Sequence, residues 1–163
     1  MEQLQGFVNA PTTAAFGGYI QLDYVSIDAV DTANMTHNIV DGRFYGGIPL
    51  LPNRSWLTMP AVENAPRSWE VTQQDTKHDD RYTATAGGML KGTDAVTIKE
   101  LNRMKKRFFV VLATRPDGTR ILLADPVFPA KFDFSVDGGG EGLQRSRTKF
   151  KFTGKNNYGY AQW

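Results

Sequence analysis

The sequence predicts a mainly β protein, a largely antiparallel β-sandwich or β-barrel with one α-helix near residues 97–107. Two observations predict the β class: segments with alternating polar and apolar residues recur along the chain, and glycine or proline breakers separate them. A third predicts the helix, because residues 97–107 place their apolar side chains at helical spacing. We expect residues 1–17 to form an N-terminal arm and residues 18–163 a single β-rich domain.

The first expected strand is residues 18–27, "GYIQLDYVSI", and a long loop over 28–54 follows it with a short strand near 43–45. Further strands before the helix are expected at 55–60, 68–76 and 81–87. The last two form a hairpin around the polar turn "KHDD". One face of this hairpin is expected to carry Trp69, Val71 and Gln73 opposite Tyr82, Ala84 and Ala86.

The helix is expected to begin at Thr97, because Thr97 and Glu100 have the spacing of a capping box. Its apolar stripe consists of Ile98, Leu101 and Met104. Basic residues follow at its C-terminal end, where the helix dipole favours cations.

After the helix the sequence predicts a buried strand at 108–114, a Pro-Asp-Gly turn and a returning strand at 120–124. A closing ribbon then runs from 131 to 152, with its two strands separated by a glycine-rich tip. One face of this ribbon holds Phe132, Phe134, Phe150 and Phe152, which we expect in the core.

Composition limits the chemistry that is available. The chain has no cysteine, which excludes disulfides, thiolate zinc sites and cysteine nucleophiles. Its first residues lack the pattern of a signal peptide, and no apolar run approaches the roughly 18 residues of a membrane helix. We therefore expect a soluble protein made in the cytoplasm, without membrane partners.

No motif of an enzyme or a cofactor site is found. The two histidines, His37 and His78, are far apart in sequence, whereas a catalytic zinc usually needs three protein ligands. The residues His78, Asp79 and Asp80 are interpreted as a solvated turn, and the glycine pairs lack the lysine and serine or threonine of a phosphate loop. We predict that the protein is not an enzyme and that it has no catalytic, cofactor or metal site.

Basic residues recur at every second position in Arg145, Arg147, Lys149 and Lys151. Such a row suits a phosphate backbone, but it also suits a solvent face with lysines that protect a strand edge. The formal net charge is only +2, and Asp133, Asp137 and Glu141 lie in the same ribbon. The second interpretation is favoured, and nucleic-acid binding is not expected.

The segments "LNRMKKRFFVVLATRPDGTRILLADPVFPAKFDFSVDGGG" and "TKFKFTGKNNYGYAQ", within residues 97–163, resemble structural proteins of tailed phages and prophages, of the tail-tube or tail-completion kind. The resemblance implies a β-sandwich or β-barrel with one helix and no catalytic residues. It also implies a virion tail subunit that associates through its arm, loops and C-terminal ribbon with further copies or with other phage structural proteins.

An alternative function remains open. A β-sandwich that binds carbohydrate or another ligand would use exposed aromatic side chains as stacking platforms. The candidates for such platforms are Tyr45, Trp56, Trp69 and Trp163.

Overall fold

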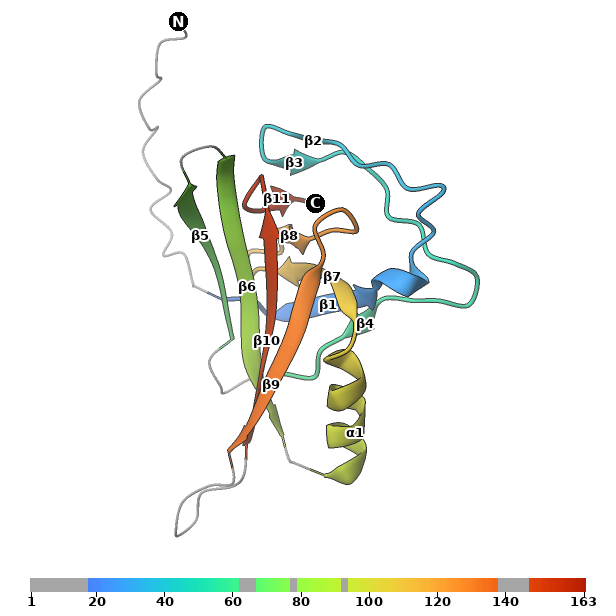
Figure 1. Cartoon of the computed structure of the whole chain (residues 1–163), viewed down its shortest axis with the longest axis vertical. Coiled ribbons are helices and arrows are strands. Elements are labelled where there is room, and N and C mark those ends of the chain that lie inside the picture. The colour runs from blue at the N-terminus through green and yellow to red at the C-terminus, as the bar shows by residue number, and fades with distance from the viewer. Residues whose placement is uncertain (1–17, 62–66, 77–78, 92–93, 138–146) are drawn as a thin grey trace, which may run out of the picture.

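The computed structural model describes residues 18–61, 67–76, 79–91, 94–137 and 147–163 (Figure 1). The expected N-terminal arm, the glycine tip of the closing ribbon and His78 of the hairpin turn lie outside the described residues. Within them, eleven strands form one mostly antiparallel sheet that is accompanied by a single α-helix. The predicted mainly β class is confirmed.

The strands follow the expected order, with two short additions at β2 and β11. A single 3₁₀ turn, Ile27–Ala29, follows the first strand. The strands are β1 (Gln21–Ser26), β2 (Ile39–Val40), β3 (Arg43–Phe44), β4 (Leu57–Thr58), β5 (Ser68–Thr76), β6 (Asp79–Lys91), β7 (Phe108–Thr114), β8 (Arg120–Ala124), β9 (Ala130–Asp137), β10 (Arg147–Asn156) and β11 (Ala161–Gln162).

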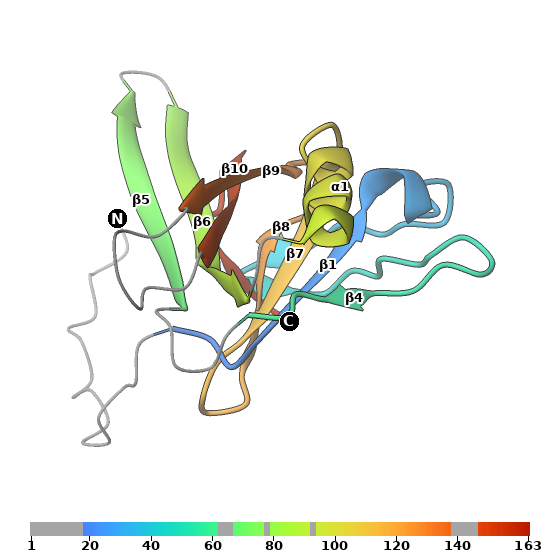
Figure 2. The same cartoon turned by 90° about the horizontal axis from the view of Figure 1, so that it is seen from below.

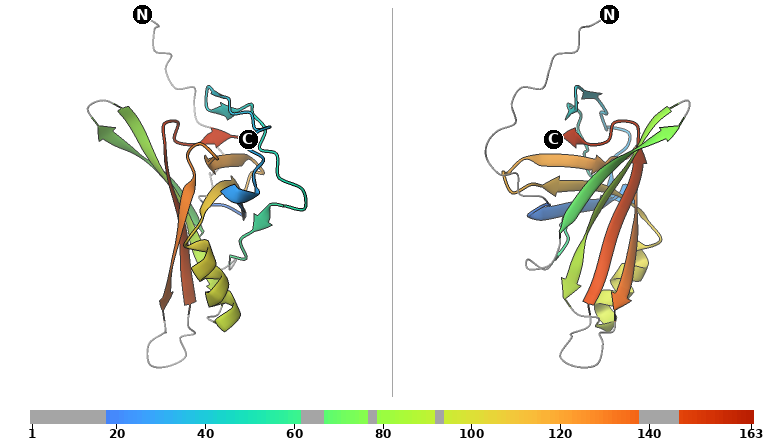
Figure 3. Two further views of the ribbon diagram at one scale, coloured as in Figure 1. Left: turned by 45° about the vertical axis from the view of Figure 1, so that its right-hand side comes forward. Right: turned by 90° about the vertical axis from the view of Figure 1, so that its left-hand side faces the viewer.

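The sheet divides at β7. Strand β1 pairs along one edge of β7, while the other edge is shared: β8 pairs with Val111–Thr114, and β9 pairs with Phe108 and Phe109. Strands β8 and β9 therefore lead into two layers (Figures 2 and 3). We name the layer β4-β1-β7-β8-β11-β3-β2 sheet I and the layer β9-β10-β6-β5 sheet II.

The main core lies between the two sheets. Its centre is a group of aromatic rings, in which Phe152 of sheet II lies 5.6 Å from Phe109 and 5.0 Å from Phe132 between ring centroids. Three of the four phenylalanines predicted for the core are buried, and Phe134 is partly buried and packs against them. The alternating pattern of the ribbon thus marks the inner face of sheet II, as predicted.

A second, smaller core lies on the opposite face of sheet I. Val110, Leu112 and Leu122 point to this face and are fully buried. The covering side chains come from residues 27–54, including Val30, Phe44 and Ile48. The long loop predicted at 28–54 therefore shields an apolar face of the sheet.

The hairpin of β5 and β6 has the predicted face, because Trp69 pairs with Ala86, Val71 with Ala84 and Gln73 with Tyr82. Strand β6 continues to Lys91, beyond the end predicted at 87. Gly88 stays within the strand, paired with Phe150, and its lack of a side chain leaves room for the neighbouring side chains. A Cβ at Gly88 would lie 2.7 Å from the Tyr19 hydroxyl and 3.0 Å from the Phe150 ring.

The helix α1 spans Ala95–Met104, which is two to three residues earlier than predicted. The prediction that Thr97 is the N-cap is wrong: Asp94 is the cap, and its Oδ1 accepts a hydrogen bond from the Thr97 N–H at 2.6 Å. Aspartate caps as well as threonine does, and here it stands one turn earlier. This hydrogen bond lowers the pKa of Asp94.

The predicted apolar stripe of α1 packs on the core. Leu101 and Met104 are buried, and Ile98 is partly buried against the same cluster. The helix lies beside β9, where Lys105 forms an ion pair with Asp133 at 3.3 Å. The helix thus covers the core at one end of the two layers (Figure 1).

We expect Leu101→Ala to lower the free energy of unfolding by ~2–5 kcal/mol, because it leaves a cavity under the helix. Val96→Ala in the same helix is the control, since Val96 is 80% exposed, and its cost should stay within about 0.5 kcal/mol. Urea denaturation of both variants measures the difference. An unchanged midpoint for Leu101→Ala would mean that the helix does not stabilise the core.

Candidate functional site

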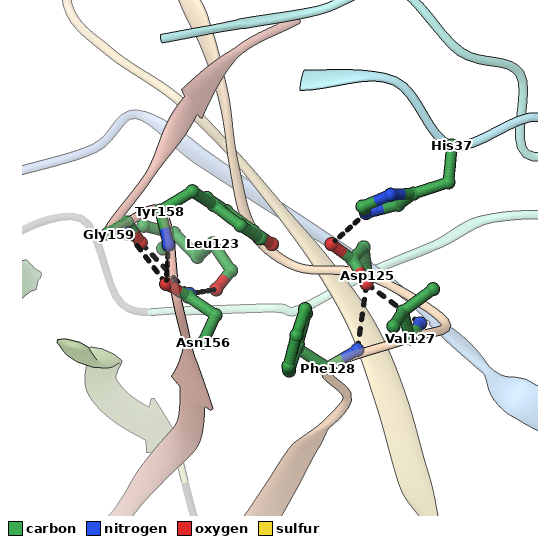
Figure 4. A network of polar contacts seen from close by, with 8 residues as sticks. All are labelled: His37, Leu123, Asp125, Val127, Phe128, Asn156, Tyr158 and Gly159. Carbon is green, nitrogen blue, oxygen red and sulfur yellow. Dashed lines mark hydrogen bonds and ion pairs between the residues drawn. The ribbon is translucent and has the colours of Figure 1, made fainter. Parts of the chain in front are cut away.

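A buried polar cluster lies where β8 ends (Figure 4). Asp125 directly follows β8 and is completely buried. Its Oδ1 accepts hydrogen bonds from the backbone N–H groups of Val127 at 2.7 Å and Phe128 at 2.8 Å, which closes the turn that leads to β9. Its Oδ2 lies 2.8 Å from His37 Nε2.

Tyr158 lies beside this aspartate. Its hydroxyl oxygen is buried and forms no hydrogen bond of ordinary geometry with the described residues. Burial and then the negative charge of Asp125 raise the pKa of Tyr158 far above its usual value. The tyrosine is therefore held in its neutral form.

Asn156, at the end of β10, organises the neighbouring turn. Its Oδ1 accepts hydrogen bonds from the N–H groups of Tyr158 at 3.1 Å and Gly159 at 2.6 Å. Its Nδ2 donates to the Gly159 carbonyl at 3.0 Å and to the Leu123 carbonyl at 3.4 Å. The buried amide thus fastens the turn after β10 to β8.

The hydrogen bonds of this cluster link segments that are distant in the sequence. His37 belongs to the 27–54 loop, so its bond to Asp125 attaches that loop to the turn between β8 and β9. A catalytic histidine would also need a hydroxyl or thiol within hydrogen-bond reach. Among the described residues, no such group forms a hydrogen bond to His37; the hydroxyl of the adjacent Thr36 accepts one from the Gly47 N–H.

Neither a metal-binding cluster nor a membrane-spanning helix is present in the described part of the chain. The described residues contain no group of three or more His, Cys, Asp or Glu side chains that could hold a metal ion. His78 and the side chains of Asp79 and Asp80 lie outside the described part. None of the helices in the described ranges is long and apolar enough to cross a membrane.

Two of the candidate aromatic platforms meet. Trp163 stacks on Phe44 with 5.1 Å between ring centroids and lies edge-to-face with Trp56 at 6.2 Å. Trp163 is 39% exposed, and the Arg120 guanidinium lies 5.9 Å from its ring. Tyr45 is exposed on the neighbouring loop segment, whereas Trp69 donates a hydrogen bond to the Gly18 carbonyl elsewhere.

Sheet II has two open edges within the described residues. Strand β5 pairs with β6 on one side, and no described strand pairs with its other side over Ser68–Thr76. Strand β9 pairs with β7 through Ala130 and Lys131, and beyond them no described strand pairs with that edge. A strand edge of this kind can pair with a strand of another molecule.

The basic row lies on the outer face of sheet II. The cations Arg147, Lys149 and Lys151 are exposed on β10, and Arg145 lies outside the described residues. The predicted solvent face is confirmed, because these cations are exposed and the phenylalanines that alternate with them are buried. The expectation that they protect a strand edge is wrong, because β10 lies between β9 and β6. The hydrogen bond and charge of Lys105 lower the pKa of Asp133 on this face.

No protein-family model, curated protein or solved structure matches this chain. Its class therefore follows from the structure alone: a mainly β protein with one helix, two packed layers and two open strand edges.

Sequence reasoning did not identify the cluster of Asp125, Asn156 and Tyr158. The sequence signal for Asp125 is its position before Pro126, which is typical of a turn. An aspartate in a turn often accepts a hydrogen bond from the backbone N–H two residues further along the chain. The pairing with His37 has no sequence signal, since 88 residues separate the two side chains.

We expect Asp125→Ala to lower the free energy of unfolding by ~1–3 kcal/mol, because two backbone N–H groups and the imidazole lose their acceptor. Tyr158→Phe is the control: its hydroxyl lies beside the Asp125 carboxylate but outside standard hydrogen-bond geometry, so its loss should cost less than about 1 kcal/mol. Urea denaturation compares the two variants. Equal losses would show that the hydrogen bonds to Asp125 contribute no more to stability than the Tyr158 hydroxyl does.

Proposed function

We propose that the protein is a non-enzymatic structural subunit of a phage or prophage tail-like assembly, made in the cytoplasm and located in the virion tail. It associates with further copies of itself through strand edges, arm and loops. The observation that carries the proposal is the pair of open edges on sheet II. The sequence resemblance supports the phage class, and the fold agrees with the β-rich subunit that the resemblance implies.

The direction of the strands suits repeated association. Each neighbouring pair in sheet II is antiparallel, from β9 through β10 and β6 to β5. With four strands in alternation, the two outer strands run in opposite directions. A second copy placed beside β5 through its own β9 would therefore continue an antiparallel sheet.

The composition of β5 supports an edge that is meant to be covered. Monomeric proteins protect long edge strands with charged side chains, above all lysine, and with proline or bulges. The segment Ser68–Thr76 contains neither lysine nor proline, its charged residues are Glu70 and Asp75, and it pairs with β6 over nine residues without a register shift. Such an edge in a stable soluble protein favours a partner strand.

We expect the wild-type protein to form oligomers whose mass increases with concentration, measured by sedimentation velocity. Ser68→Lys with Thr72→Lys places two cations on β5 and should weaken association at least about tenfold, or ~1.4 kcal/mol. Thr32→Lys with Asn157→Lys adds the same charge at exposed positions outside the sheet edges and should leave association unchanged. A wild-type protein that stays monomeric at high concentration would contradict the proposal.

A second candidate function, a carbohydrate-binding module, is favoured by the contact between Trp56 and Trp163. Part of the Trp163 ring is exposed, and sugars stack on such rings. Addition of mixed oligosaccharides should then change tryptophan fluorescence, and Trp163→Ala should abolish the change while Trp69→Phe retains it. The subunit proposal expects no sugar-dependent change in any of these proteins.

A further inference from the structure

Cationic side chains gather on one face of the molecule. Alternate residues of β10 point outward from sheet II, because Phe150 and Phe152 between them are buried. The outward cations continue onto the adjacent strand, since Lys131 of β9 lies opposite Thr153. The cations of this row are Lys131, Arg147, Lys149, Lys151 and Lys155.

Acidic side chains offset this row only in part. At outward positions of the described strands the acids are Glu70 on β5, Asp79 on β6, and Asp133 and Asp137 on β9. Strand β6 adds the cations Arg81 and Lys91 at outward positions. Asp133 lies opposite Lys151 in the register, yet its carboxylate is paired with Lys105 from the end of the helix at 3.3 Å. The face thus keeps an excess of positive charge, although the net charge of the whole chain is only +2.

The same face is hollowed. A depression of about 550 Å³ lies over the middle strands, with Lys149 and Lys151 among its lining residues. Gly87 lines it as well and lies opposite both Lys151 and Ser68, and it has no side chain that would fill the depression. The hydroxyl groups that line the depression are those of Ser68, Thr85 and Ser135, and the carboxylate of Asp133, paired with Lys105, lines it as well.

We propose that the outer face of sheet II binds the phosphate backbone of double-stranded nucleic acid. Lysine, arginine, serine, threonine and backbone N–H groups are the usual contacts to phosphate oxygens. Side chains on one face of a strand recur about every 6.6 Å, so the row along β10 offers a line of cations rather than one isolated charge. This inference departs from the expectation drawn from the sequence, which counted the small net charge and Asp133, Asp137 and Glu141 against the row.

Two other ligand classes fit the face less well. Single-stranded nucleic acid is bound through stacked aromatic rings, and the phenylalanines of β9 and β10 point into the core instead. An acidic peptide would need apolar pockets for its side chains, and Met89 is the large apolar residue at the outward positions of the described strands. Phe134 and Phe150 also line the depression, but they belong to the inner face of the sheet. Binding is therefore expected to depend on backbone charge, without selection of base sequence.

The test is a fluorescence-polarisation titration of a labelled mixed-sequence duplex with the full chain at low salt. We expect a dissociation constant roughly in the micromolar range, which weakens roughly 100-fold between about 50 and 200 mM salt if about four phosphates are contacted. Single strands of the same length should bind no more tightly. The assay does not depend on self-association, so it stands apart from the proposed function.

Matched variants assign the binding to this face. Lys149→Glu with Lys151→Glu should weaken binding at least tenfold, and the neutral pair Lys149→Gln with Lys151→Gln should weaken it less. Lys99→Glu with Lys106→Glu changes the net charge equally at exposed positions of α1 and its end, and should retain most of the affinity. Circular dichroism melts confirm that each variant is folded.

Three outcomes would overturn the proposal. They are absence of duplex binding by the wild type at low salt, equal losses in the face and control variants, and equally tight binding of polyglutamate, which would indicate an acidic protein partner.

Discussion

The division of one edge of β7 between two strands determines the rest of the architecture. Phe108 and Phe109 pair with β9, while Val111–Thr114 pair with β8, so the two following strands must leave in different directions. A register shift between Val111 and Leu112 marks the point of separation. Such a bulge bends and twists a strand locally. Sheet II consequently folds back over sheet I, and the aromatic rings between the layers become the core.

The core in turn requires glycine where rings approach the backbone. Gly88 lies opposite Phe150 in the ladder, and the Tyr19 ring reaches the same place, where its hydroxyl donates to the Gly87 carbonyl at 3.0 Å. Burial raises the pKa of Tyr19 to about 12, so this donor stays protonated at neutral pH. Gly88 thus permits close packing on the inner face of sheet II. Gly87 leaves the outer face without a side chain at the depression.

Strands with strict alternation could be predicted from the sequence because one face of each is buried and the other is solvated. The facing residues of β5 and β6 and the phenylalanines of β9 and β10 belong to this class. The end of β6 and the bond between His37 and Asp125 could not be predicted, because each depends on which distant segment packs there. The helix cap is a local feature, but Asp94 and Thr97 are both typical caps, so the pattern alone does not choose between them.

The two faces of sheet II cannot be altered independently. Successive residues of a strand point to opposite faces, so a shift of one residue in β10 would place lysines in the core and phenylalanines outside. The burial of Phe150 and Phe152 therefore fixes Lys149 and Lys151 on the outer face. The same ladder leaves the outer strands β5 and β9 with open edges, so core packing places the basic face between the two edges through which copies are proposed to associate. If copies join edge to edge, their basic faces become continuous. The affinity for a polyanion then increases with the number of faces that bind the same polyanion at once.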